Sequence, residues 1–270
     1  MKYADVALFT DLDGTLFNSQ HAVSEKNRDA IARFTRQGGS FGISTGRGPI
    51  NAKQMLADVE LNAWSVVLNG GEAYNYQLGA VASPIHLDKA AAETLMAWVI
   101  EQLPEVNIML CTEEKLLFPS NPDYADRHFV ETHQPMDMVT LEEAKAYNWM
   151  KILFCAPRPM LEQIRAHGEE TCAEGAMESV YTNPVYLEYM PPKVNKGNCL
   201  RRLRQLPQLQ GKCFVAVGDY TNDLELLREA DVAVAVGNAL PEVKAVADHV
   251  ICTNDEDAIA YLIDVLIPSL

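Results

Sequence analysis

The chain has 270 residues, of which 48% are hydrophobic and 22% are charged, and its formal net charge is −15. This composition is typical of a soluble globular protein with one large α/β domain or two smaller domains. The acidic balance argues against a nucleic-acid partner, which requires a basic face, and no stretch approaches the ~20 apolar residues of a membrane span. Because the first residues include no long apolar run of the kind found in a secretion signal, we expect a cytoplasmic protein.

The six cysteines are scattered along the chain, and the two closest are 14 residues apart. Without a C-x-x-C pair they predict neither a zinc ribbon nor a redox dithiol. The six histidines also lack the spacing of metal ligands. We therefore expect buried free thiols, and the chemistry of this chain has to come from other residue types.

The first part of the chain predicts a parallel sheet. Residues 6–10 (VALFT) form an expected strand, and a helix begins near Ser24, a good N-cap, and ends at the glycine pair 38–39. Residues 40–44 (SFGIS) and 64–71 (WSVVLNGG) are the next expected strands. Because the strands are continuous apolar runs separated by helices, they indicate a parallel sheet covered on both faces.

The last part of the chain repeats this alternation. Strands are expected at residues 213–219, 231–239 and 250–253, and helices at 221–230, 241–249 and 255–267. The two parts together predict a doubly wound, mostly parallel, Rossmann-like α/β sheet.

The middle of the chain has a different texture. Expected helices at 88–103 and 159–170 are interspersed with expected strands at 107–111, 115–118, 149–156 and 185–190. Hairpin-like strands with helices between them predict an inserted α+β domain. We therefore expect a core made of residues 1–83 and 191–270, interrupted by a second domain at 84–190.

Two aspartates one residue apart, Asp11 and Asp13, end the first expected strand. Side chains at i and i+2 of an extended segment point to one face, so these two charges repel each other unless something positive lies beside them. Ligands of an open parallel sheet bind beyond the carboxyl ends of its strands. Polar residues also lie at the ends of the other expected strands, at 44–47, 69–71 and 219, and residues 222 and 223 follow at the start of the next helix.

These residue types indicate a site for a cation and a phosphate group. Several carboxylates in one crevice are costly without a hard divalent cation, and Mg²⁺ takes oxygen ligands and commonly works beside phosphate. The hydroxyl of Thr45 next to the backbone NH of Gly46 makes a cradle for phosphate oxygens. Lys196 opens an expected helix and would supply a fixed positive charge, with Lys193 as a nearby alternative.

Four short motifs resemble those of one enzyme family. D-x-D-G-T-L stands at residues 11–16, Thr45 ends a strand in ISTGR, Lys196 lies in KVNKG, and GDYTND stands at 218–223. The segments LNGG and VGNA add to the pattern. In these motifs the chain is similar to the phosphatases of the haloacid dehalogenase superfamily and, within it, to the Cof-type subfamily. The resemblance covers essentially the whole chain in order.

The resemblance implies a role for each carboxylate. Asp11 would attack phosphorus and form an aspartyl-phosphate, and Asp13 would protonate the leaving oxygen and then take a proton from the attacking water. Asp11, the backbone carbonyl of Asp13, and Asp219 would hold Mg²⁺, with Asp223 in direct or water-mediated support. One of the two paired carboxylates would thus be a metal-bound nucleophile and the other a proton carrier, in environments that separate their pKa values.

The resemblance also implies a phosphate cradle and a class of substrate. Asp11, Thr45, Gly46, Lys196 and Asn222 would surround the transferring phosphoryl group. The partner would be a small phosphomonoester, since relatives act on sugar phosphates, pyridoxal phosphate and flavin mononucleotide. We expect a monomer or a weak homo-oligomer, with no nucleic-acid or membrane partner.

The insertion at 84–190 resembles the larger α/β cap of this subfamily, which excludes water and selects the substrate. Tyr181, Asn183, Tyr186 and Glu188 are candidates for contacts with the leaving group, although their alternation equally fits the packing of a sheet. Arg47 is a further candidate, either for a substrate contact or for a surface ion pair.

Several alternatives accompany this interpretation. An EF-hand loop starting at Asp11 is disfavoured, because glycine falls at loop position four rather than six and Ala22 stands at position twelve. The hydroxyl assignment would shift by one if Ser44 replaced Thr45, and Tyr220 departs from the small residue often found at its position. The alternative functions are a phosphomutase, which passes the phosphoryl group to a sugar, and a phosphate-binding or regulatory protein without turnover.

Overall fold

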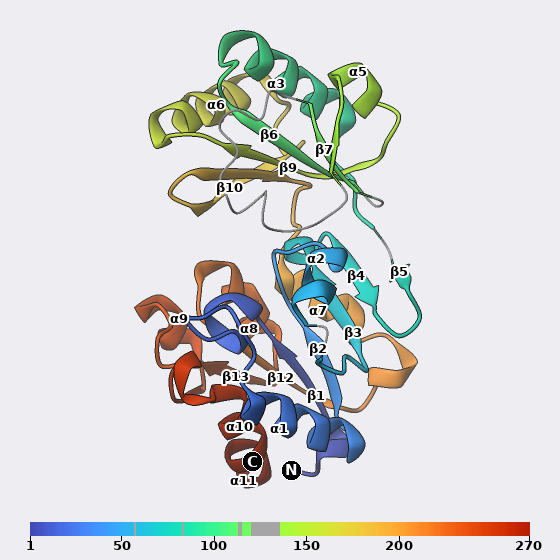
Figure 1. Cartoon of the computed structure of the whole chain (residues 1–270), viewed down its shortest axis with the longest axis vertical. Helices are drawn as coiled ribbons and strands as arrows, with labels where there is room; N and C mark the ends of the chain where they lie inside the picture. The colour runs from blue at the N-terminus through green and yellow to red at the C-terminus, as the bar shows by residue number, and fades with distance from the viewer. Residues whose placement is uncertain (57, 83, 113–114, 120–135) are drawn as a thin grey trace. The chain divides into compact units, whose positions relative to one another are not determined.

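The computed structural model describes residues 1–56, 58–82, 84–112, 115–119 and 136–270 (Figure 1). The chain divides into two compact units. The first consists of Met1–Ser83 together with Asn195–Leu270, and the second is Pro84–Val194. Among the described residues, none of the helices has the length and apolar character needed to span a bilayer.

The first unit is built on a five-stranded parallel sheet in the order β14-β13-β12-β1-β2. Every residue of β1 is buried at the centre of this sheet, as its unbroken apolar run predicts. The doubly wound α/β class expected from the sequence is therefore confirmed. The strands are β1 (Val6–Thr10), β2 (Ser40–Ile43), β12 (Cys213–Gly218), β13 (Val232–Ala235) and β14 (His249–Val250).

Helices flank this sheet and close its hydrophobic core. The first of them starts where the sequence places it, since the Ser24 hydroxyl accepts a hydrogen bond from the backbone NH of Asn27 at 3.1 Å. Its apolar stripe, with Ile31 and Phe34, is buried, and the chain leaves it through Gly38 at φ +90°. The helices are α1 (Glu25–Arg36), α2 (Pro49–Met55), α7 (Lys196–Leu203), α8 (Leu224–Glu229), α9 (Pro241–Val246), α10 (Ala258–Tyr261) and α11 (Ile267–Ser269).

The third expected strand does not simply extend the parallel sheet. Residues Trp64–Val67 (β3), Glu72–Asn75 (β4) and Ala80–Ala82 (β5) form a separate antiparallel sheet, β3-β4-β5. The chain reverses because Asn69 and Gly70 adopt φ values of 53° and +97°. A single parallel bridge, Ser44 to Val66, joins β3 to the end of β2. Beside that bridge, the hydroxyl of Ser65 accepts the backbone NH of Ile43 at 3.1 Å.

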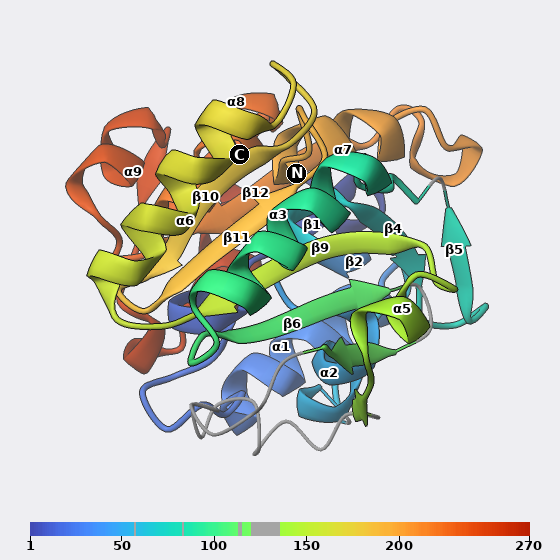
Figure 2. The same ribbon diagram turned by 90° about the horizontal axis from the view of Figure 1, so that it is seen from above.

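The second unit has a six-stranded mixed sheet in the order β10-β11-β9-β6-β7-β8. Its two long helices, α3 (Lys89–Gln102) and α6 (Arg158–Thr171), cover one face of this sheet (Figure 2). β7 and β8 run parallel, and the other neighbours are antiparallel. The remaining elements are β6 (Asn107–Thr112), β7 (Leu116–Phe118), β8 (Met136–Met138), α5 (Leu141–Ala144), β9 (Trp149–Cys155), β10 (Glu178–Asn183) and β11 (Tyr186–Met190).

The two faces of this second sheet differ in polarity. Ile152, Phe154 and Leu187 belong to the apolar cluster beneath the helices. Their neighbours along the strands point to the opposite face, where the ammonium of Lys151 lies 3.0 Å from the Glu188 carboxylate. Only 5% and 7% of these two side chains are exposed, so this ion pair is desolvated.

Removing one charge of this pair is expected to cost more than removing both. Glu188→Leu deprives the buried Lys151 ammonium of its carboxylate and should lower the free energy of unfolding by about 3 kcal/mol. Lys151→Met combined with Glu188→Leu replaces both charges with apolar side chains of similar volume and should recover most of that loss. Urea unfolding of the full chain measures both variants.

Glu162→Leu is the matched control, because its ion pair with Arg158 on α6 is exposed and should contribute less than about 1 kcal/mol. A double variant as unstable as Glu188→Leu would contradict the assignment of the loss to the separation of Lys151 from the Glu188 carboxylate.

Candidate active site

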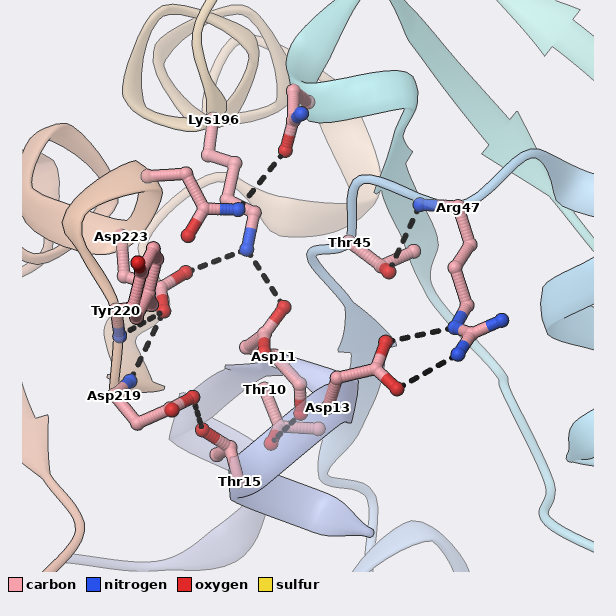
Figure 3. A network of polar contacts seen from close by, with 12 residues as sticks. Thr10, Asp11, Asp13, Thr15, Thr45, Arg47, Lys196, Asp219, Tyr220 and Asp223 are labelled. Carbon is pink, nitrogen blue, oxygen red and sulfur yellow. Dashed lines mark hydrogen bonds and ion pairs between the residues drawn. The ribbon is translucent and has the colours of Figure 1, made fainter. Parts of the chain in front are cut away.

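Polar side chains from four segments gather at the carboxyl ends of the parallel strands (Figure 3). The segments are the turns that follow β1, β2 and β12, and the first residue of α7. Strand β1 lies between β12 and β2, so the turn after β1 stands between the other two. This is the edge at which ligands of open parallel sheets bind.

The turn after β1 lies close to the loop after β12, and both carry acidic residues. The backbone NH of Asp11 donates to the Val217 carbonyl at 2.9 Å, which extends the pairing of β1 with β12 by one residue. Gly14 then turns the chain with a φ of +80°. A Cβ on Gly14 would lie 2.5 Å from a carboxylate oxygen of Asp219, so only glycine permits this approach.

Three carboxylates form one cluster. Asp11, Asp219 and Asp223 each offer an oxygen, and the three oxygens lie within 4.8 Å of one another. The Thr15 hydroxyl donates to Asp219 at 2.7 Å. One oxygen of Asp223 accepts the backbone NH groups of Asp219 and Tyr220 at 3.0 and 3.2 Å, which fixes the loop after β12. Tyr220 itself is 44% exposed.

Lys196 places an ammonium group inside this cluster. Its Nζ donates to Asp11 Oδ1 at 2.7 Å and to Asp223 Oδ1 at 2.6 Å, and the side chain is completely buried. Burial disfavours the charged form, but the charges of Asp11 and Asp223 outweigh this effect and raise the pKa of Lys196. The lysine therefore stays charged, and Lys193 is not the residue that binds these carboxylates.

The negative charge of the cluster is still only partly neutralised, because three carboxylates share one ammonium. Burial raises the pKa of Asp11 well above its usual range, and although Lys196 opposes this, the carboxylates of Asp223, Asp219 and Asp13 reinforce it. Burial, aided by Asp223, also raises the pKa of Asp219 to about 6, against the hydrogen bond from Thr15. Such a set of crowded oxygens fits a hard divalent cation such as Mg²⁺.

Asp13 lies outside this cluster, although it is only two residues from Asp11. Its two carboxylate oxygens accept hydrogen bonds from Nε and Nη2 of Arg47, at 2.7 and 2.8 Å (Figure 3). This is a bidentate pair of the strong, directional kind. Of the two possibilities that the sequence left open for Arg47, the structure shows an ion pair, and its partner is Asp13.

The end of β2 supplies hydroxyl and amide groups. The Thr45 hydroxyl accepts the backbone NH of Arg47 at 3.1 Å, whereas the Ser44 hydroxyl is buried without a hydrogen-bond partner among the described residues. Asn222 donates from its amide to the Asn69 side chain at 3.1 Å. A Cβ on Gly46 would come within 3.0 Å of the same Asn69 side chain, so the segments after β2 and β3 approach closely here.

The candidate residues of the second unit lie on different faces of its sheet. Tyr181 is paired with Leu187 in register, and its ring lies 3.4 Å from the guanidinium carbon of Arg158 on α6. Tyr186 and Glu188 are buried on β11. The side chain of Asn183 lies outside the described residues. Their contacts with a substrate stay a prediction.

Sequence reasoning missed two contributors to this site. Thr15 stands inside the D-x-D-G-T-L motif, so its hydroxyl was available as a signal. Asn51 had no such signal, because it lies on the short helix α2 and reaches the site only through its contact with Arg47 at 2.7 Å.

This arrangement suits attack on an electrophilic centre that carries negative charge. Asp11 is a carboxylate held in place by an ammonium group, with the carboxylates of Asp219 and Asp223 beside it. Asp13 is a second carboxylate with its own partner, in a separate environment. Two carboxylates with separate environments are what a nucleophile and a proton carrier require.

The chain is similar to known proteins over nearly its whole length. The family model described as haloacid dehalogenase-like hydrolase matches residues 8–263. The chain is 27% identical to phosphatase YwpJ of Bacillus subtilis, over 93% of this chain and 96% of the relative. It is 26% identical to 5-amino-6-(5-phospho-D-ribitylamino)uracil phosphatase YcsE of the same organism, over 94% of this chain and 92% of the relative.

A solved structure shares the fold over nearly the full length. A haloacid dehalogenase-like hydrolase from Bacteroides thetaiotaomicron superposes with a TM-score of 0.86 at 23% identity, covering 97% of this chain and 99% of that one. The match of the family model to almost the whole chain shows that the chain belongs to the haloacid dehalogenase-like hydrolases.

Proposed function

We propose that this hydrolase is a Mg²⁺-dependent phosphatase that hydrolyses small phosphomonoesters through an aspartyl-phosphate on Asp11. The observation that carries the proposal is the buried ammonium of Lys196 between Asp11 and Asp223, beside a third carboxylate. This combination restrains a nucleophile and leaves negative charge for a cation to balance. Named relatives of similar length are phosphatases, which supports the same reaction class.

In the first step, an oxygen of Asp11 attacks phosphorus, and the bond from phosphorus to the ester oxygen breaks. Lys196 holds Asp11 Oδ1, so it limits the orientations of the attacking carboxylate. Asp13 gives its proton to the leaving oxygen, which departs as a neutral alcohol. The Thr45 hydroxyl and the Gly46 amide, with Lys196 and Asn222, would bind the oxygens of the phosphoryl group.

In the second step, water attacks the phosphorus of the aspartyl-phosphate. Asp13, now a carboxylate, takes a proton from this water, and the bond from phosphorus to Asp11 breaks. Asp11, Asp219 and Asp223 would hold the Mg²⁺ ion, which neutralises charge on the phosphoryl oxygens when it is bound. Inorganic phosphate leaves, and both aspartates return to their starting states.

The proposed substrates are phosphate esters of small sugars or cofactors, and the unit Pro84–Val194 is proposed to select among them. The name of the Bacillus subtilis relative YcsE specifies a ribityl phosphate as its substrate. At 26% identity that name supports the class of ester for this chain.

Asp11→Asn is expected to reduce turnover by at least about 10³-fold, because an amide cannot act as the nucleophile. Release of inorganic phosphate from a panel of phosphomonoesters, with Mg²⁺ or with EDTA, measures this. Asp29→Asn on α1 is the matched control, since it makes the same change at an exposed position.

Wild-type protein that is folded yet inactive on every ester with Mg²⁺ would contradict the proposal and favour a phosphate-binding role. Transfer of the phosphoryl group to an added sugar, rather than to water, would favour a phosphomutase.

Mg²⁺ is expected to raise the melting temperature at about pH 7.5 and to raise it much less at about pH 5. Because the pKa of Asp219 is about 6, this carboxyl is protonated at the lower pH, and the cation then has to displace a proton to bind. At the higher pH the carboxylate is already ionised. Thermal unfolding with Mg²⁺ or EDTA at the two pH values measures the difference.

Asp219→Asn should lose most of the Mg²⁺-dependent shift at both pH values, and Asp29→Asn should keep it. An equal shift at both pH values in the wild-type protein would contradict the assignment of Asp219 as a cation ligand.

A further inference from the structure

The contact between Arg47 and Asp13 has a geometry that the two-step reaction does not by itself require. Arg47 presents Nε and Nη2 to the two oxygens of Asp13, at 2.7 and 2.8 Å, so both oxygens are directed away from the cluster of Asp11, Asp219 and Asp223 (Figure 3). A planar fork of this kind fixes the rotation of the carboxylate as well as its position.

Arg47 is itself held from the other side. Its third nitrogen, Nη1, donates to Oδ1 of Asn51 at 2.7 Å, and its backbone NH donates to the Thr45 hydroxyl at 3.1 Å. Asn51 is buried on α2, with only 4% of its surface exposed. Of the two ion-pair partners, Arg47 is 13% exposed and Asp13 is 44% exposed. The guanidinium is therefore the anchored partner, and the carboxylate is the one that it orients.

We propose that Arg47, held by Asn51, is a positioning residue that keeps the Asp13 carboxylate out of the acidic cluster and aligned for proton transfer. The inference rests on the proposed phosphatase function. When Asp13 carries the proton for the leaving oxygen, one of its two hydrogen bonds from Arg47 breaks, and the other still fixes the side chain. When Asp13 acts as the base, Arg47 donates both hydrogen bonds.

The physical reason for such a device is the spacing of the two aspartates. Asp13 is tethered two residues from Asp11, next to a cluster that binds cations, so a free Asp13 side chain would be drawn toward any cation held there. Proton transfer requires Asp13 at the leaving oxygen instead. Arg47 supplies a competing positive charge with a fixed direction.

The test compares two esters that differ in their need for a proton. An alkyl phosphate releases an unstable alkoxide unless its leaving oxygen is protonated, whereas p-nitrophenyl phosphate releases a stable phenolate. The ratio kcat/KM reports the steps up to formation of the aspartyl-phosphate. Arg47→Met should lower kcat/KM for the alkyl ester by about 100-fold and for the aryl ester by less than about fivefold.

Two further variants separate positioning from a general structural effect. Arg47→Lys keeps the charge but not the fork, and it should lie between Arg47→Met and the wild type. Asn51→Ala should reduce alkyl-ester turnover by about three- to tenfold, with the same preference for the aryl ester. Arg36→Met, an exposed arginine on α1, is the matched control and should change neither ester.

A double-mutant cycle gives the sharpest outcome. If Arg47 acts through Asp13, then Asp13→Ala combined with Arg47→Met should be no slower on the alkyl ester than Asp13→Ala alone. The inhibition constant of inorganic phosphate should be unchanged in Arg47→Met. Additive losses in the cycle, equal losses on both esters, or phosphate binding weakened more than about tenfold would overturn the proposal, and the last would make Arg47 a direct phosphate ligand.

Failure of this inference differs from failure of the proposed function. Wild-type protein without Mg²⁺-dependent turnover on either ester contradicts the phosphatase assignment. Wild-type turnover with Arg47 variants that lose both esters equally contradicts only the positioning role. If thermal unfolding shows that Arg47→Met is misfolded, Arg47→Lys and Asn51→Ala carry the same comparison.

Discussion

The ammonium group of Lys196 is the interaction on which the rest of the site depends. Burying an ammonium group costs several kcal/mol of free energy unless nearby carboxylates compensate its charge. Here Asp11 comes from the end of β1 and Asp223 from the turn after β12, so one lysine at the start of α7 binds both. Because Lys196 has to contact both Asp11 and Asp223, this pair of contacts fixes where α7 begins relative to the sheet. It also explains Gly70, because a Cβ there would lie 2.1 Å from the carbonyl oxygen of Asn195, the N-cap of α7.

The acidic groups of the site lie in two kinds of environment, although Asp11 and Asp13 are only two residues apart. The cluster of Asp11, Asp219 and Asp223 retains excess negative charge around one ammonium group, which suits a cation. Asp13 instead has a guanidinium partner of its own. Because attraction in a partly desolvated site is stronger than in water, these partners, rather than the intrinsic acidity of aspartate, set the different electrostatic environments of the carboxylates.

The residues whose convergence the sequence could predict are those that directly follow a strand. Asp11, Thr45 and Asp219 end apolar runs, and one rule about parallel sheets places such residues at one edge. Lys196 could be proposed from its place at the start of a helix, but only the family motif favoured it over Lys193, because nothing in its local pattern shows that the side chain is buried. The Arg47–Asn51 contact could not be predicted, because it depends on how α2 packs after the turn.

The fold shows the same division. Strands β1, β2 and β12 could be read from their apolar runs, because both of their faces are buried. The reversal after β3 could not, since it depends on backbone torsions at residues 69–70. Strand β10 was missed as well, because its sequence, ESVYTN, lacks a strong apolar signal.

The order of the strands has a consequence for the assembly of the protein during synthesis. β1 precedes the other strands of its sheet in the chain, yet its neighbour β12 lies about two hundred residues later. Asp11 and Asp219 therefore meet only after most of the polypeptide has been made. The unit Pro84–Val194, in contrast, is one continuous segment with its own core, and it is complete before β12 is synthesised. Strand β1 can pair with β2 early, but its other edge has to wait for β12, so that edge is exposed to wrong pairing while the chain is incomplete.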